Sequence, residues 1–304
     1  MTGESRSTPS VAVVGDVMVD VVVLVSAPFA HASDTPSMIT TAPGGSAANQ
    51  AVWLARAGLA VTIAASIGDD PVGDAALRTL AAEGVQVEKV RRVRRATGVV
   101  VALVEPDGQR SMLTDRGANL ELTPEMVDGA LSAMARVTHV HVSGYCLLDE
   151  STRPAGLRAV EWARAAGTSL SVDASSAAPL RSLEAGAFLS WVAGADYLLA
   201  NLDEGAALTS LERAEDIVER LAEDVGEAVL TLGASGVLVK RSDGRSVRAT
   251  ANAPVVTDTT GAGDAFCATY LARRLCRRGI DEALADAALA ASSAVASVGA
   301  RTWR

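Results

Sequence analysis

The segment best suited to chemistry is a glycine-rich turn at residues 258–264, Asp-Thr-Thr-Gly-Ala-Gly-Asp, which follows an apolar run and precedes a helical pattern. Gly261 and Gly263 allow the backbone to approach a ligand closely. The free N–H groups of Gly261, Ala262 and Gly263 would then point at whatever lies over the helix N-terminus, where the helix dipole also favours an anion. The turn therefore predicts a site for a phosphate-like group.

Asp264 lies in the first turn of that helix. A lone carboxylate there would only complement the helix dipole, which is worth about 0.3–1 kcal/mol. Transfer of a phosphoryl group, however, needs anion-stabilising donors and a carboxylate within reach of the incoming hydroxyl. This short segment supplies both, so we predict that Asp264 is the general base of a phosphoryl transfer.

Strands that alternate with helices are expected to position this turn. Residues 11–14 are a continuous apolar run, typical of a strand buried on both faces. From residue 123 onward helical and strand patterns alternate, which predicts an α/β fold with a mostly parallel sheet covered on both sides. The expected helices are 46–57, 71–83, 123–135, 152–166, 182–193, 212–225, 262–278 and 281–298, and the further strands are 61–67, 85–90, 138–143, 168–173, 196–200 and 228–232.

Two segments, about 19–43 and 97–115, do not fit this alternation. The second contains Glu105-Pro106-Asp107-Gly108 between two apolar runs, which indicates a hairpin. Periodicity is lost over residues 26–43. We interpret the two segments as a small β-sheet lid that projects from a single domain covering residues 1–304.

Composition limits the function classes. The chain has 304 residues, 49% of them hydrophobic, and a formal net charge of −9, so nucleic acid is not an expected partner. No apolar stretch is long enough to cross a membrane, and no secretory signal precedes the first strand. The three cysteines form no CxxC pair and are read as small buried hydrophobes. A cytoplasmic protein is expected.

Residues 258–264 resemble the C-terminal signature of the ribokinase, or PfkB, family of carbohydrate kinases. Pro43-Gly44-Gly45-Ser46-Ala47-Ala48-Asn49-Gln50-Ala51 resembles the other signature of that family, at the expected distance. The correspondence extends from Gly15 to Gly299. The resemblance implies a Rossmann-like, three-layer αβα sandwich with a β-lid that often mediates homodimers, and an ATP- and Mg²⁺-dependent kinase acting on a small sugar-like molecule.

The resemblance also implies roles for single residues. Asp264 matches the general base, and Gly261, Ala262 and Gly263 match the anion hole over the transferred phosphoryl group. The remaining matches are substrate contacts at Asp20, Gly44, Gly45 and Asn49, a Mg²⁺ and phosphate element at Asn201 and Glu204, a nucleotide loop at Thr231, Gly233 and Gly236, and a site for a monovalent cation such as K⁺ at Asp258 and Thr260.

Several of these residues have a purely structural alternative. Asn201 and Glu204 fit a helix cap with its capping-box partner, and residues 231–236 fit a turn into a hairpin. His139 and His141 alternate along a strand with no third ligand in sight, which favours structural histidines. Arg110 and Arg116, on the second lid segment, could reach an acidic or phosphorylated substrate, but solvated surface arginines are favoured.

Other functions are less well supported by the sequence. No GxGxxG motif follows the first strand and no GxxxxGK[ST] motif occurs, which disfavours a Rossmann oxidoreductase and a Walker-type NTPase. A non-catalytic sugar or nucleotide sensor on the same fold remains an alternative. Ser46 and Ala47 stand where typical ribokinases carry Lys-Gly, so ribose itself is not implied. A free sugar or sugar acid is favoured as the acceptor, with a nucleoside as the alternative.

Overall fold

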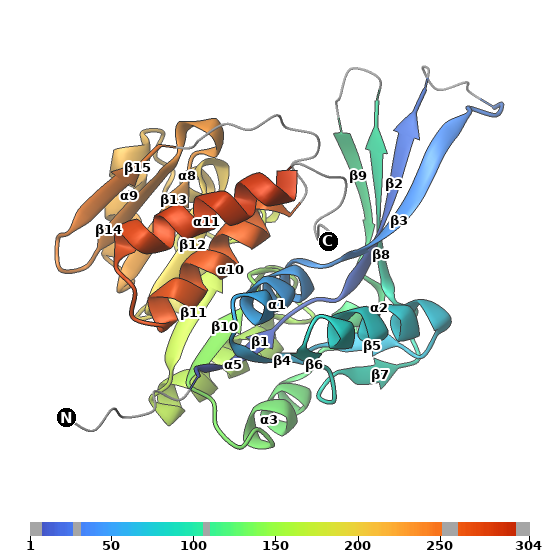
Figure 1. Ribbon diagram of the computed structural model, residues 1–304, viewed down its shortest axis with the longest axis horizontal. Coiled ribbons are helices and arrows are strands. Elements are labelled where there is room, and N and C mark those ends of the chain that lie inside the picture. Colours follow the sequence, from blue (N-terminus) through green and yellow to red (C-terminus); the bar gives the residue numbers. More distant parts are fainter. Residues whose placement is uncertain (1–7, 27–31, 106–109, 251–260, 296–304) are drawn as a thin grey trace.

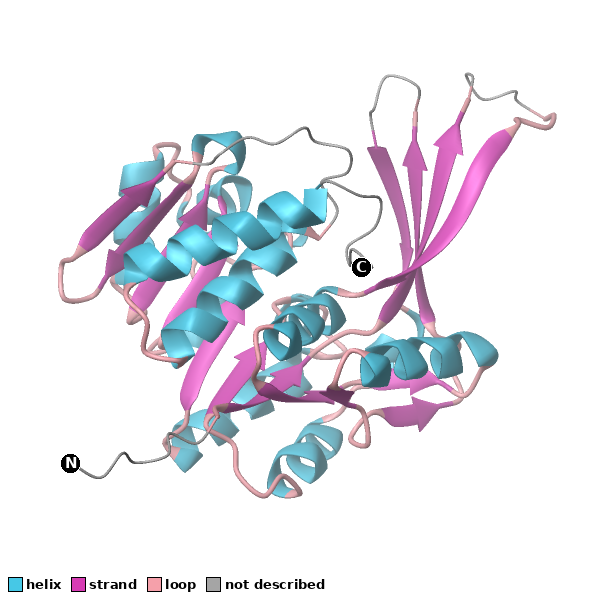
Figure 2. Cartoon of the chain, in the orientation of Figure 1, coloured by secondary structure: helices cyan, strands magenta, loops and turns pink. Residues whose placement is uncertain are grey.

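The computed structural model describes residues 8–26, 32–105, 110–250 and 261–295, which form a large sheet between two layers of helices (Figures 1 and 2). The large sheet has nine strands in the order β15-β14-β13-β12-β11-β10-β1-β4-β6. All neighbours from β6 to β13 are parallel, and β14 and β15 are antiparallel. The strands are β1 (Ser10–Val14), β4 (Ala60–Ala64), β6 (Val85–Gln86), β10 (His139–Val142), β11 (Ser169–Asp173), β12 (Tyr197–Asn201), β13 (Glu227–Thr231), β14 (Val237–Arg241) and β15 (Ser246–Ala249).

Two clusters of buried hydrophobic residues lie on one face of the sheet and a third lies on the other, and together they show which helices cover which face. One face is covered by α1 (Ser46–Arg56), α2 (Pro71–Ala82), α10 (Ala262–Leu275) and α11 (Ile280–Val295). The other is covered by α3 (Pro124–Ser132), α4 (Tyr145–Leu148), α5 (Arg153–Ala166), α6 (Ala177–Arg181), α7 (Ala187–Val192), α8 (Leu202–Thr209) and α9 (Ala214–Ala222). The predicted three-layer αβα sandwich is therefore confirmed.

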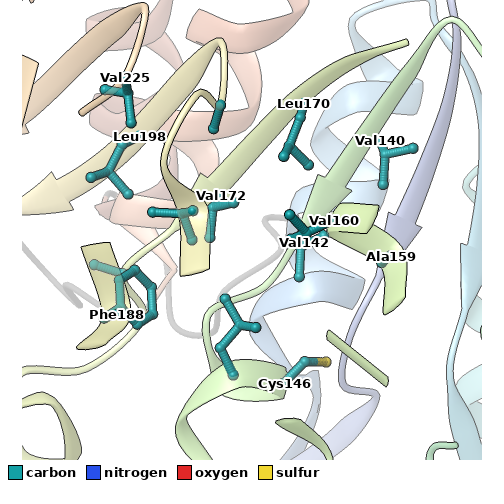
Figure 3. Close-up of a cluster of buried hydrophobic side chains, with 14 of the residues drawn as sticks. Val140, Val142, Cys146, Ala159, Val160, Leu170, Val172, Phe188, Leu198 and Val225 are labelled. Carbon is teal, nitrogen blue, oxygen red and sulfur yellow. The ribbon is translucent and has the colours of Figure 1, made fainter. Parts of the chain in front are cut away.

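The central strand β1 explains why its sequence is apolar without interruption. Val11 and Val13 pack into the core beneath α1 and α10, whereas Ala12 and Val14 pack into the core beneath α5. None of the four is more than 1% exposed. Figure 3 shows the second core, where side chains of β10, β11 and β12 meet α5 and α7; the labelled residues are Val140, Val142, Cys146, Ala159, Val160, Leu170, Val172, Phe188, Leu198 and Val225.

A second sheet of four strands projects away from this body (Figure 1). Its order is β3-β2-β8-β9, and its strands are β2 (Met18–Val25), β3 (Ser37–Gly44), β8 (Gly98–Val104) and β9 (Arg110–Asp115). Four of the eight residues of β3, at positions 38–41, are exposed. An edge strand with neither face buried has no alternation of polar and apolar residues, which is why residues 37–43 show no period. A third, two-stranded sheet pairs β5 (Ser66–Gly68) with β7 (Arg91–Val93).

Several expected elements differ from the observed ones. The strand expected at 61–67 is two strands, because the chain leaves β4 at Ala65 and pairs with β7 as β5. The strand expected at 85–90 is only β6. The helix expected at 182–193 is only α7, which begins after Gly186 with its φ of 77°, and α6 ends before residue 182. Cys146 is buried as expected, but Cys276 is exposed because it follows the last turn of α10.

Candidate active site

Polar residues collect at one edge of the large sheet, where the parallel strands end. Asp16 follows β1, Asp173 ends β11, and Asn201 and Thr231 end β12 and β13, facing each other in register. The strand order reverses beside β1, since β4 lies on one side of it and β10 on the other. The crevice at such a reversal is the usual ligand site of an open parallel sheet.

Asp264 reaches this edge from the first turn of α10 and is held by α1. The Ser46 hydroxyl donates to Asp264 Oδ1 at 2.7 Å, and Asn49 Nδ2 donates to Oδ2 at 2.9 Å. Gln50 Nε2 lies 3.3 Å from Oδ1. The two glycine-containing segments of the sequence, 215 residues apart, therefore meet through side chains of facing helices.

The surroundings of Asp264 make its carboxyl group a weaker acid. Burial raises the pKa of Asp264 to about 7, against the opposing hydrogen bonds from Asn49 and Ser46, and the charges of Asp173 and Asp16 raise it further. A carboxyl group with a pKa near 7 can accept and release a proton at neutral pH, as general acid–base catalysis requires.

Two further carboxylates lie beside it that we did not assign a role from the sequence. Asp16 accepts from the backbone N–H groups of Ser46 and Ala47, each at 3.2 Å, at the start of α1. Asp173 accepts from Gln50 Nε2 at 2.8 Å and from the Ser175 hydroxyl. Gln50 thus bridges Asp173 and Asp264. The signal that could have found Asp173 is an acidic residue at the end of a buried strand.

The first turn of α10 is open to a ligand. Gly261 has a φ of 76° and precedes the helix, whose first N–H groups lack intrahelical acceptors. Gly263 is exposed, and a Cβ atom added there would meet no atom of the described residues within 4 Å. Ala262 lies between them at the start of the helix. Asp258 and Thr260 lie outside the described residues.

The expected substrate contacts lie where the small sheet joins the body. A Cβ added to Gly44 would lie 2.1 Å from Asp20 Oδ1, so the carboxylate of Asp20, on β2, occupies the space over Gly44. Gly45 has a φ of 91°, and a Cβ there would lie 2.7 Å from the Asp16 carbonyl oxygen. Since Asn49 binds Asp264 directly, this segment connects the small sheet to the carboxylate on α10.

Asn201 and Glu204 form a capping box at the start of α8. Asn201 Oδ1 accepts from the Glu204 N–H at 2.9 Å, and the Glu204 carboxylate accepts from the Asn201 backbone and side-chain N–H groups at 2.8 Å. Burial raises the pKa of Glu204 to about 7, against these bonds from Asn201, with the charges of Asp173 and Asp203 adding to the rise. A cation beside this carboxylate would offset the free-energy cost of burying its negative charge.

The loop after β13 also has a structural role. Gly233 has a φ of 57°, and a Cβ added there would meet no described atom within 4 Å. A Cβ on Gly236 would lie 2.0 Å from the Ala249 carbonyl oxygen, so Gly236 is required by the β14–β15 hairpin. Thr231 is half-buried at the strand end. These residues neighbour Asn201 at the same sheet edge.

The two strand histidines are partnered by serines. His139 lies 2.6 Å from Ser169 Oγ and 2.7 Å from Ser171 Oγ, and His141 lies 2.7 Å from Ser171 Oγ. Within residues 8–26, 32–105, 110–250 and 261–295, no group of three or more His, Cys, Asp or Glu side chains is placed to hold a metal ion.

One expectation from the sequence is wrong. Arg116 is not a solvated surface arginine: it is half-buried, and its guanidinium carbon lies 4.8 Å from the centre of the Tyr145 ring. The turn that follows β9 folds back onto the body and carries Arg116 with it. The side chain of Arg110 lies outside the described part of the structure.

Comparisons with known proteins agree in both sequence and fold. A family model described as "pfkB family carbohydrate kinase" matches residues 8–303. An ATP-dependent ribose-1-phosphate kinase from Halopiger xanaduensis is 33% identical over 85% of this chain and 82% of its own length. A ribokinase from Bacillus subtilis is 29% identical over 96% of this chain and 94% of its own length.

Solved structures give the same picture. Adenosine kinase from Sinorhizobium meliloti superimposes with a TM-score of 0.85 at 27% identity, covering 98% of this chain and 96% of that one. A putative ribokinase II from E. coli in complex with ATP and Mg²⁺ has a TM-score of 0.80 at 22% identity, covering 96% and 94%, which compares the fold alone. No helix among the described residues has the length and apolar character needed to span a membrane.

Proposed function

The chain belongs to the pfkB family of carbohydrate kinases, and from this premise we propose that it transfers the γ-phosphoryl group of ATP to a hydroxyl of a sugar or sugar acid, with Asp264 as general base. As a member of this family it is an ATP-dependent sugar or nucleoside kinase. The observation that carries the proposed role is the position of Asp264: a carboxyl group with a pKa of about 7, held by two side chains of α1 beside the open first turn of α10.

The proposed reaction is a direct in-line transfer. Asp264 accepts the proton of the acceptor hydroxyl while the hydroxyl oxygen bonds to the γ-phosphorus, and the bond from that phosphorus to the bridging oxygen of ADP breaks. The N–H groups of Gly261, Ala262 and Gly263 donate to the oxygens of the transferred group, which stabilises its charge. Ser46 and Asn49 keep the Asp264 carboxylate oriented toward the hydroxyl.

The nucleotide is proposed to lie along the ends of β12 and β13. Thr231, Gly233 and Gly236 would line its site, since this loop is open at Gly233. Asn201 and Glu204 would face Mg²⁺ carried on the phosphates; the buried, weakly acidic carboxyl group of Glu204 fits a nearby cation. A bound Mg²⁺ would neutralise part of the negative charge of the ATP phosphates. A monovalent cation such as K⁺ at Asp258 and Thr260 is part of the same proposal.

The acceptor is proposed to lie between the small sheet and the body. Asp20 would accept from its hydroxyl groups, and the glycines at 44 and 45 would give it close access to the backbone, next to Asn49 and the base. Closure of the small sheet, residues 19–43 and 97–115, as a lid of the single domain would exclude water, so that ATP is not hydrolysed instead.

Two alternatives remain open. A nucleoside acceptor is supported by the fold and 27% identity shared with an adenosine kinase. A non-catalytic sensor would keep ligand binding without turnover. We also propose a cytoplasmic homodimer that uses neither nucleic acid nor membrane as a partner; the free cysteines among the described residues suit a reducing compartment.

A coupled ADP-release assay tests the proposed function, with pentoses, hexoses, keto-deoxy acids and nucleosides as acceptors, with and without K⁺. Asp264→Asn should lower kcat by about 10²–10⁴-fold while ATP and acceptor still bind, because only the proton acceptor is lost. Asp281→Asn is the matched control, since Asp281 is an exposed first-turn carboxylate of α11 and should leave kcat unchanged.

Near-normal turnover of Asp264→Asn would refute the role of Asp264. Binding of ATP and sugar without ADP release from the unaltered protein, for every acceptor, would favour the sensor. Turnover of nucleosides alone would favour the nucleoside kinase.

A further inference from the structure

Arg116 is held in place by its own turn. It precedes the short 3₁₀ helix Gly117–Glu121, and Asn119 donates to the Arg116 carbonyl oxygen from both its backbone N–H and Nδ2. The same Asn119 side chain pairs with the backbone of Val17, accepting from its N–H at 2.9 Å and donating to its carbonyl at 3.0 Å. Val17 follows Asp16 directly, so Arg116 is fixed beside the end of β1.

The partner of Arg116 lies at the same edge of the sheet. Tyr145 begins α4, just after β10, and its N–H donates to Ser175 Oγ at 3.0 Å. Burial raises the pKa of Tyr145 to about 12, and the charges of Asp16, Asp173 and Asp264 act in the same direction, so these carboxylates lie near the ring. Arg116 and Tyr145 therefore belong to the crevice that contains the proposed general base.

Among the described residues, no acceptor is placed against Nε of the Arg116 guanidinium. Nε of Arg116 is buried and has no hydrogen-bond partner, and no ion pair joins this side chain to any other residue in the described part of the chain. A buried charged donor without an acceptor costs about 1–3 kcal/mol or more, and such groups in native structures call for a functional explanation.

A second stacked arginine shows the contrast. Arg153 lies 4.7 Å from the centre of the Trp191 ring, yet its Nε donates to the Leu147 carbonyl at 2.8 Å and its Nη2 to the Leu148 carbonyl at 3.3 Å. Stacking on a ring therefore does not by itself leave the donor edge of a guanidinium empty. At Arg116 the ring covers the face of the guanidinium, and the buried Nε lacks an acceptor.

The guanidinium of Arg116 provides a positive charge in a crevice that is otherwise lined by carboxyl groups. Asp16, Asp173, Glu204 and Asp264 make this end of the sheet negative, in a chain with a net charge of −9. An anionic acceptor would be repelled unless a cation met it. The planar donor fork of a guanidinium matches the oxygens of phosphate and carboxylate groups.

We propose that Arg116, held flat on Tyr145, binds an oxyanion group carried by the acceptor, which makes the acceptor a sugar phosphate or a sugar acid. This inference rests on the kinase function proposed above and narrows its substrate class. A phosphate monoester and a carboxylate each present a pair of oxygens to the guanidinium of Arg116. The experiment below therefore has to distinguish a sugar phosphate from a sugar acid.

The test compares acceptors that differ only in charge. ADP release is measured with pentose and hexose phosphates, sugar acids, the parent neutral sugars and nucleosides, for the unaltered enzyme and for Arg116→Met, Arg116→Lys and Arg153→Met. We expect the unaltered enzyme to favour an oxyanion-bearing acceptor, and Arg116→Met to raise the KM for it about tenfold or more, with the KM for ATP unchanged. The KM of Arg116→Lys for this acceptor should lie between the values for the unaltered enzyme and Arg116→Met, because lysine keeps the positive charge but lacks the planar pair of donors.

The control Arg153→Met removes a stacked arginine outside the proposed site and should lower the melting temperature without changing acceptor preference. Loss of activity on phosphates alone, or on acids alone, identifies the source of the oxyanion. Preference of the unaltered enzyme for a neutral acceptor, or an equal fall in kcat for every acceptor in Arg116→Met, overturns the inference while the kinase function stands. Absence of ADP release with every acceptor would instead remove the kinase function itself.

Discussion

Asp264 and Glu204 both have pKa values raised to about 7, but their neighbours differ. The carboxylate of Glu204 is occupied by the capping box that starts α8. Among the residues that the structure describes, the carboxylate of Asp264 is held by side chains of α1, beside the first turn of α10. The same shift therefore occurs in a helix cap at Glu204 and at the proposed general base at Asp264.

The pH dependence of activity should report Asp264. Its carboxyl group is protonated below its pKa and cannot then accept a proton, so kcat/KM should rise as the pH increases through about 7. Because Glu204 titrates in the same range, the profile is measured for Glu204→Gln as well. Retention of the acidic limb in Glu204→Gln supports Asp264, and its disappearance would assign the limb to Glu204.

Thermal unfolding gives an independent measure of the same shift. A carboxyl group whose pKa is raised in the folded state favours folding below its unfolded pKa of about 4, and this contribution is lost as the pH rises through the folded pKa of about 7. Asp264→Asn should therefore gain stability relative to the unaltered protein between pH 5 and pH 8. A difference in melting temperature that does not change with pH would contradict the raised pKa.

At the scale of elements, α10 is anchored at both ends, which fixes where its first turn lies. Its N-terminal end is held through Asp264 by α1. Near its C-terminal end, Tyr270 Oη and Arg274 Nε donate to Glu227 Oε1 at 2.8 and 3.0 Å, and Arg274 Nη2 donates to Oε2 at 2.8 Å. Glu227, which begins β13, is only 3% exposed.

Loss of this anchor should be costly. Glu227→Gln leaves the Arg274 charge without its partner in a largely buried place, and we expect a loss of about 3 kcal/mol in the free energy of unfolding, measured with urea. The matched control is Asp286→Asn, which breaks the half-exposed ion pair between Arg273 of α10 and α11 and should cost less than about 1 kcal/mol. Equal losses in the two variants would refute the anchoring role of Glu227.

At the scale of the whole molecule, the small sheet has two different faces. The register places Asp20, Val100 and Thr114 on one face. The opposite face carries Ile39, Val21, Val23, Val101, Leu103 and Leu113, together with the polar Thr41 and Ser111, while Met38 and Met112 are exposed on the Asp20 face. Ile39 is 62% exposed and Leu113 59% exposed. Exposed apolar side chains gathered on one sheet face are typical of an interaction surface, which supports the proposed homodimer through this sheet.

The double variant Ile39→Glu, Leu113→Glu should shift the proposed dimer to a monomer, because each charge would be buried in the interface. The measurement is light scattering after size-exclusion chromatography. Leu289→Glu is the control, since Leu289 is 67% exposed on α11, away from the sheet, and should leave the mass unchanged. A dimer that survives the double variant would place its interface elsewhere.

The local features of this protein were predictable from its sequence. The two glycine-containing segments, the alternating strands and helices and the buried strand at 11–14 each depend on neighbouring residues, because backbone freedom and the period of burial are local properties. The family resemblance also follows from contiguous motifs. For the same reason the sequence placed residues 19–43 in a β-sheet lid but gave no bounds for β3, because a strand exposed on both faces leaves no period to detect.

Only the tertiary structure decided which distant side chains lie beside the glycine-rich turn. Gln50 bridges Asp173 and Asp264 across separations of 123 and 214 residues, and the half-buried position of Arg116 depends on a turn that folds back onto β1 through Asn119. Such contacts, and the pKa values they produce, arise from the packing of distant segments and the burial of charge between them, which residue spacing along a chain does not encode. The turn at 258–264 predicted a phosphate chemistry; the fold brought to it the residues proposed to orient the base and select the acceptor.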